Sequence, residues 1–287
     1  MTECKFDSLI INGKANGKAN GKTTNEMVYD AYLESSNQYK ELPAKLRKDS
    51  DRVRLDLFKE ACSQKENGFL FRKTNNANDA LINHWISKVK RIAYLYASYN
   101  DLVEFGSFTK ADAKDIADNN SDVEYLKSIE SELARKGIIF IVEPSIPGLK
   151  LDGVVFKIES GNPVVAMSLR FNRLDNFWFT LMHELAHIVL HIEKIDNYII
   201  DDLEQESTEL IELEANKLAG NLLIPRNVWR SCAVRRDRQL DSILSFSKDN
   251  NVHPAIVAGR LRKETGNYKI FSNIINEIDV REVLSSE

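Results

Sequence analysis

The motif HELAH at residues 183–187 constrains this chain more than any other stretch of its sequence. In an α-helix, residues four positions apart lie on one face, so His183 and His187 can direct both imidazoles to one metal ion. Glu184 lies about 100° further round the helix, where its carboxylate can hold a water molecule without binding the metal. Two imidazoles and one anionic ligand leave a coordination position open, which is typical of a hydrolytic rather than a structural site.

The residues around the motif predict that its helix is buried. The stretch 177–190 is apolar on nearly every face apart from the motif, and Asp175 or Asn176 can cap the N-terminus. Burying two histidines and a glutamate in such a helix costs desolvation free energy, which metal binding compensates. The alternative is a pair of core histidines that hydrogen-bond to backbone groups and bind no metal.

Several residues can supply the third ligand or support the first two. His191 continues the row of histidines, but it lies one turn (~5.4 Å) too far along the helix, so we interpret it as supporting a ligand or merely packed. The stretch 207–224 predicts a second helix, in which Glu212 and Asn216 are four residues apart. One of these two can bind the metal while the other hydrogen-bonds a ligating imidazole. Glu214 points about 160° away from Glu212, so only one of the two glutamates can face the site.

These motifs resemble those of the ImmA/IrrE metallopeptidases. Besides HELAH, the resemblance rests on the pattern E-x-E-A-N-x-x-A-x-x-L-x-x-P, formed by Glu212, Glu214, Ala215, Asn216, Ala219, Leu222 and Pro225. The stretches 175–179, 201–203 and 252–260 are similar to the branch that is fused to HigA-like antitoxin regulators. The resemblance covers roughly residues 69 to 281.

The resemblance implies one Zn²⁺ per chain, or Mn²⁺ in its place, with His183 and His187 as ligands and Glu184 as general base. The first glutamate of the E-x-E pattern recurs in the family, which favours Glu212 over Glu214 as the third ligand. A small group of residues then remains as candidates to support the ligands or contact substrate: His191, Asn216, Asp175 and Glu214.

The resemblance also implies a substrate and a role. We expect an endopeptidase that cleaves a DNA-binding repressor of the Xre/Cro type, or an antitoxin-type protein, encoded nearby. Such cleavage regulates transcription of a phage, mobile-element or stress operon. Relatives in this branch usually carry a helix-turn-helix domain ahead of the peptidase, and residues 1–68 do not look like one, so we expect a repressor supplied in trans. In peptidases of this type a strand often pairs with extended substrate, and the strand 164–169 is the one we expect to do so.

Another function class is a non-proteolytic, antitoxin-like regulatory protein that binds a partner protein or operator DNA through the same fold. The stretch 240–263 has the pattern of a helix-turn-helix, with Arg260 and Arg262 on its second helix. The net charge of −4, however, gives the chain no overall attraction to nucleic acid. We therefore expect a packed helical subdomain there and no direct binding of nucleic acid.

Composition and patterning predict a soluble, cytoplasmic α+β protein. Of 287 residues, 43% are hydrophobic and 29% charged, and no apolar run approaches the ~20 residues that span a bilayer. Three widely spaced cysteines predict no disulfide framework, and the N-terminus lacks the layout of a signal peptide. Strands are predicted at 138–142, 154–158 and 164–169, the last two as a hairpin, with a further short strand at 198–200.

The order of these patterns predicts four parts. A helical N-terminal region precedes a zincin-like metallopeptidase core, in which a small sheet carries the HExxH helix and the glutamate-bearing helix, and a C-terminal helical subdomain follows. The predicted parts are a flexible segment with NGKA repeats at 1–25, a helical domain at 26–136, the peptidase core at 137–225 and the C-terminal subdomain at 226–287.

Overall fold

The structure is a computed structural model that describes residues 24–66, 78–195, 198–201 and 210–286. The chain divides into two compact units, Met1–Asn75 and Asn76–Glu287. The NGKA repeats and the acidic stretch 202–204 lie outside the described residues, and the division into four parts stays a prediction. None of the described helices combines the length and the hydropathy that crossing a bilayer requires.

The described part of the first unit is a pair of packed helices, α1 (Thr24–Glu41) and α2 (Ser50–Glu66). Pro43, which lacks a backbone N–H, follows α1, and a short 3-10 turn at Ala44–Arg47 leads into α2. The helical character expected of this region is thereby confirmed.

The second unit contains a four-stranded sheet. Its strands are β1 (Ile139–Val142), β2 (Gly153–Lys157), β3 (Pro163–Met167) and β4 (Tyr198–Asp201), in the order β1-β3-β2-β4. β1 runs parallel to β3, and β2 is antiparallel to both β3 and β4. The predicted strands, the β2–β3 hairpin and the α+β class are confirmed; Gly161 supplies the positive φ of 86° in the hairpin turn.

The structure corrects the prediction that strand 164–169 offers a free edge to substrate. β3 is hydrogen-bonded to β1 on one side and to β2 on the other, so it has no edge to offer. Its apolar pattern indicates that both faces are covered, but such a pattern carries no information on where a strand lies within its sheet.

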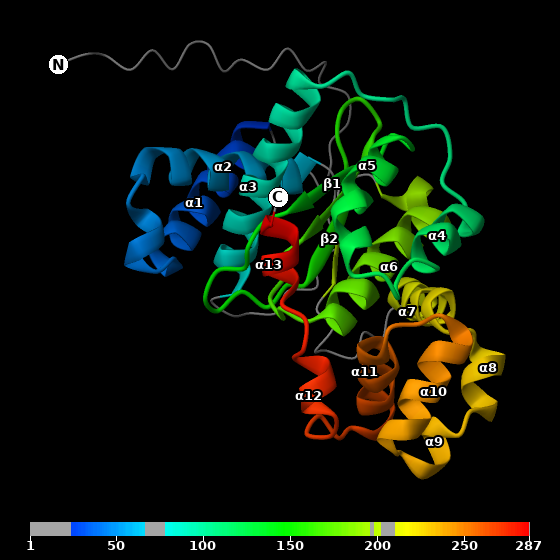
Figure 1. The fold of residues 1–287 in the computed structure, drawn as a ribbon. Helices are drawn as coiled ribbons and strands as arrows, with labels where there is room; N and C mark the ends of the chain where they lie inside the picture. The colour runs from blue at the N-terminus through cyan, green and yellow to red at the C-terminus, as the bar shows by residue number, and fades with distance from the viewer. Residues whose placement is uncertain (1–23, 67–77, 196–197, 202–209, 287) are drawn as a thin grey trace. The chain divides into compact units, whose positions relative to one another are not determined.

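Helix α6 (Leu174–His191) is central to the second unit. It packs against β2 and β3, and three further helices cover it: α4 (Lys110–Ala117), α7 (Leu210–Leu223) and α11 (Pro254–Thr265). In Figure 1, α6 lies between the strands and the pair α7 and α11. The side chains of Phe177, Trp178 and Leu181 are fully buried, as expected for an apolar helix.

The prediction that Asp175 or Asn176 caps α6 is wrong. Arg173 is the N-cap residue, and its side chain makes no capping hydrogen bond. The carboxylate of Asp175 pairs instead with the Arg173 guanidinium, with Nε 3.0 Å from Oδ1. Because an acidic residue in the first turn also interacts favourably with the helix dipole, sequence cannot tell this position from the cap.

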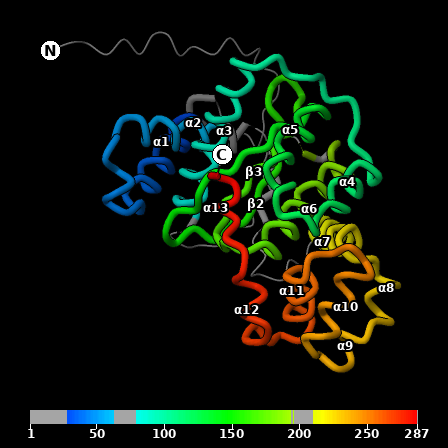
Figure 2. The backbone as a smooth tube through the Cα atoms, in the orientation of Figure 1, coloured from blue at the N-terminus to red at the C-terminus, as the bar shows by residue number. Residues whose placement is uncertain are grey.

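Several further helices complete the second unit. They are α3 (Asn78–Tyr99), α5 (Ile129–Ala134), α8 (Arg226–Ser231), α9 (Val234–Asp237), α10 (Leu240–Asn250), α12 (Ser272–Ile275) and α13 (Val280–Ser285). α3 packs against β1, where Trp85 Nε1 donates a hydrogen bond to the carbonyl of Glu143. Figure 2 shows the chain passing from α7 into the group α8–α12 before it returns as α13.

The helix-turn-helix pattern at 240–263 corresponds to α10 and α11, but α11 is packed into the fold. Arg260 Nη1 donates hydrogen bonds to the carbonyls of Gly220 (3.0 Å) and Ile224 (2.5 Å) at the end of α7. Arg262 is buried, at 7% exposure. Arg260 is thus bonded to the end of α7 and Arg262 is enclosed by the protein, which agrees with a packed helical subdomain.

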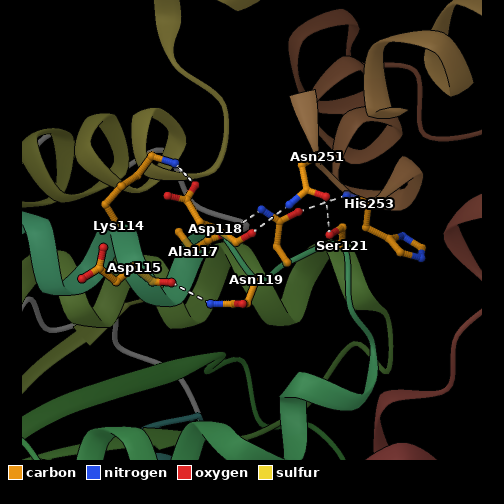
Figure 3. Close-up of polar contacts among 9 residues, drawn as sticks. Lys114, Asp115, Ala117, Asp118, Asn119, Ser121, Asn251 and His253 are labelled. Atoms are coloured by element: carbon orange, nitrogen blue, oxygen red, sulfur yellow. Dashed lines mark hydrogen bonds and ion pairs between the residues drawn. The ribbon is translucent and has the colours of Figure 1, made fainter. Parts of the chain in front are cut away.

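A polar network joins the end of α4 to the turn between α10 and α11 (Figure 3). The buried side chain of Asn120 makes the two central hydrogen bonds of this network. Its Nδ2 donates to the carbonyl of Ala117 at 2.5 Å, and its Oδ1 accepts from the backbone N–H of His253 at 3.0 Å. Nearby, Ser121 Oγ donates to Asn251 Oδ1 at 2.9 Å. The network fixes the C-terminal helices against the helix that flanks α6.

Exchanging Asn120 for alanine is expected to lower the free energy of unfolding by about 2 kcal/mol, because a buried N–H and a carbonyl lose their partner. Urea unfolding monitored by circular dichroism measures this. Asn119→Ala is the matched control, since Asn119 is exposed and its Nδ2 donates to the carbonyl of Asp115 one turn earlier, outside the contacts to the C-terminal helices. Equal stability of the two variants would show that the network does not hold the C-terminal helices.

Candidate metal centre

Helix α6 places His183 and His187 one turn apart on one fully buried face, with their Nε2 atoms 2.9 Å from each other. Helix α7 packs against α6 and directs the Glu212 carboxylate at this pair. Glu212 Oε2 is 3.1 Å from His183 Nε2, and Oε1 is 3.5 Å from His187 Nε2. The three ligand atoms all lie within 4.8 Å of one another.

The protonation states of this cluster suit a metal ion. Burial lowers the pKa of His187 to about 4, so its imidazole is neutral at pH 7. Burial raises the pKa of Glu212, but hydrogen bonds from His183 and His187 outweigh it and bring the pKa to about 2. The neutral imidazole of His187 and the imidazole of His183, converging on the carboxylate of Glu212, form a donor set that fits a divalent ion such as zinc.

Glu184 is fully buried next to the ligand pair and is not one of the three converging groups. Its carboxylate lies against strand β2 at Gly153: a Cβ atom placed on this glycine would be 2.4 Å from Glu184 Oε1 and 2.9 Å from Thr180 Cγ2. Glycine is therefore required at this point of β2 for Glu184 to occupy its position.

Gly153→Ala is expected to lower peptidase turnover about 100-fold while metal binding is kept, because the new methyl group displaces the Glu184 carboxylate. The fold should survive, since the atoms nearest the methyl group belong to side chains that can move. Gly220→Ala in α7 is the control, as a Cβ there meets nothing within 4 Å. Turnover and metal content measured on both proteins test this, and parent-like turnover of Gly153→Ala would contradict it.

The two glutamates of the E-x-E pattern occupy different places. Glu212 faces the histidine pair, whereas Glu214 is half-exposed and contacts His191, with Oε2 3.0 Å from Nε2. His191 is buried and lies with Nδ1 3.4 Å from His187 Nδ1. His191 is thus outside the converging cluster but in contact with it.

The structure does not bring the other two candidates into contact with the ligands. Asn216 follows Glu212 by one turn, but its Oδ1 is buried without a hydrogen-bond partner among the described residues. His187 Nδ1 lies 3.4 Å from His191 Nδ1. Asp175 lies two turns before His183 and is held by Arg173, close to Gly259 of α11. Gly153 is the residue that sequence reasoning missed, although a glycine at the start of an apolar strand is a signal of close approach.

In a comparison with known families, residues 134–262 match the family described as the IrrE N-terminal-like domain, which is a peptidase family. The matched range contains the whole sheet, the histidine pair and Glu212. No curated protein matches the chain significantly.

Proposed function

Because residues 134–262 form an ImmA/IrrE-type metallopeptidase domain, we propose that this protein is a zinc-dependent endopeptidase that cleaves a DNA-binding repressor or antitoxin-type protein. The observation that carries the proposal is the buried carboxylate of Glu184, directly after a candidate ligand and accommodated by Gly153. A protein that only binds a partner has no need of a base in this position.

In this proposal His183, His187 and Glu212 hold the metal ion. A zinc ion there would supply Lewis acidity towards a peptide carbonyl and a water molecule. Glu184 would accept a proton from the attacking water and pass it to the nitrogen of the leaving amine. The surrounding apolar side chains of α6 keep bulk water away from these groups, which strengthens their electrostatic interactions.

The sheet supports a place for the substrate that replaces the one expected from sequence. β4 is the outer strand next to β2, and its Asp201 is the register partner of Gly153, the residue against Glu184. An extended peptide that pairs with the outer side of β4 would run alongside the site. The cleaved bond would belong to a repressor or antitoxin, and its loss would release transcription of the operon that the repressor controls.

The test is to incubate the purified, zinc-loaded protein with repressors and antitoxins encoded beside its gene. We expect one of them to be cut into two fragments, with cleavage lost on chelation and restored by Zn²⁺. If the metal-loaded protein binds such a partner and leaves it intact, the protein is a non-proteolytic regulator and the proposal fails.

A further inference from the structure

A chain of polar side chains leads from the histidine pair to the surface of α7. His187 Nδ1 lies 3.4 Å from His191 Nδ1, and His191 Nε2 lies 3.0 Å from Glu214 Oε2. His187 and His191 are buried, whereas Glu214 is half-exposed. The chain thus connects a buried candidate ligand to a carboxylate in contact with solvent.

Hydrogen bonding allows one arrangement of protons along this chain when His187 binds a metal ion. His187 Nε2 faces His183 and Glu212, so Nε2 is the binding atom and the proton of the neutral ring must be on Nδ1. His191 Nδ1 must then accept a hydrogen bond from the His187 Nδ1–H. The single ring proton of a neutral His191 is therefore on Nε2. That N–H donates to the Glu214 carboxylate, which can only accept.

The reverse arrangement is excluded by the same carboxylate. If His191 Nδ1 carried the proton and donated to His187, the proton of His187 would occupy Nε2 and block metal binding. His191 Nε2 would then be a bare acceptor 3.0 Å from an ionised carboxylate, which is unfavourable. The negative charge of Glu214 therefore selects the tautomers of both histidines.

We propose that Glu214 and His191 are positioning residues that hold His187 in the tautomer whose Nε2 binds the metal ion. This inference rests on the proposed metal site and assigns separate tasks to the two glutamates of the E-x-E pattern. Glu212 binds the metal directly, and Glu214 acts on it through two imidazole rings. Carboxylates that orient ligating histidines commonly contribute in this way to metal affinity.

The test compares three variants of the full chain: Glu214→Ala, Glu214→Gln and His191→Phe. Competition with a chromophoric chelator measures the Zn²⁺ dissociation constant. We expect affinity to fall about 10-fold for Glu214→Ala and up to about 100-fold for His191→Phe. Glu214→Gln keeps an acceptor oxygen without the charge and is expected to lie between the parent and Glu214→Ala. Glu193→Ala is the control, because Glu193 is an exposed acid two residues from His191.

A second readout reports the tautomer itself. Two-bond ¹⁵N–¹H spectra of the metal-free protein distinguish a ring protonated on Nδ1 from one protonated on Nε2. We expect His191, whose Nε2 faces the Glu214 carboxylate, to be an Nε2–H tautomer in the parent and to become a mixture in Glu214→Ala. This measurement is independent of proteolysis, so a parent protein that cuts nothing would end the proposed function without deciding this inference.

Two results would overturn the inference. One is zinc affinity within twofold of the parent in both Glu214→Ala and His191→Phe. The other is an equal loss in the Glu193→Ala control, which would show a general effect of charge. If His191→Phe does not fold, Glu214→Ala decides alone, because its half-exposed side chain can be removed without opening a core cavity.

Discussion

Exchanging Glu184 for glutamine is expected to lower peptidase turnover by about 100- to 10,000-fold, while the protein still binds about one metal ion per chain. Glutamine has nearly the same size and fits the same buried space beside Gly153. Its amide cannot accept a proton from water, so only the base is lost. Turnover of a cleavable substrate and the metal content of the same preparation measure the two effects together.

The control for this exchange is Glu193→Gln, which removes a negative charge from an exposed position close to α6. We expect it to keep parent-like turnover. Cleavage by Glu184→Gln at the parent rate would exclude Glu184 as the general base. A variant that loses its metal would instead show that the carboxylate contributes to binding.

Exchanging Glu212 for alanine is expected to weaken metal binding by more than ~100-fold, beyond the range of residues that only support a ligand. A metal ion that binds the folded but not the unfolded state raises the free energy of unfolding. The increase is about 2.7 kcal/mol when the free metal concentration is 100 times the dissociation constant. At that metal concentration we expect the parent to gain this stability and Glu212→Ala to gain almost none. Urea unfolding with and without Zn²⁺ measures the difference.

Glu214→Ala is the matched comparison, because it removes the same side chain two residues further along α7. We expect it to keep about half of the metal-dependent stabilisation, about 1.4 kcal/mol, because its zinc affinity is expected to fall only about 10-fold. If Glu212→Ala responded to Zn²⁺ like the parent, the third ligand would have to be another group and the present description of the centre would be wrong.

The local parts of this site could be predicted from sequence. The spacing of His183 and His187 places them on one helical face whatever surrounds the helix, and the structure has them so. The β2–β3 hairpin is likewise a local feature, set by two apolar runs and the turn at Gly161. The end of α7 is also a local feature, because Pro225 cannot continue a helix and α7 ends at Leu223.

Features that depend on how elements pack could not be predicted. Helix geometry alone left Glu212 and Glu214 as alternatives, because the choice depends on the rotation of α7 relative to α6. The place of β3 inside the sheet depends on its pairing with β1, which joins residues 25 positions apart, such as Ile139 and Val164, and which no local pattern encodes. The contact between Glu184 and Gly153 joins a helix to a strand, and no spacing within either segment encodes it.

Anomalous diffraction from crystals grown with Zn²⁺ tests the central claim most directly. The account predicts one zinc peak per chain, about 2.0–2.2 Å from His183 Nε2, His187 Nε2 and a carboxylate oxygen of Glu212. A map with no peak between these three side chains, or with zinc bound elsewhere and the two imidazoles turned apart, would contradict it.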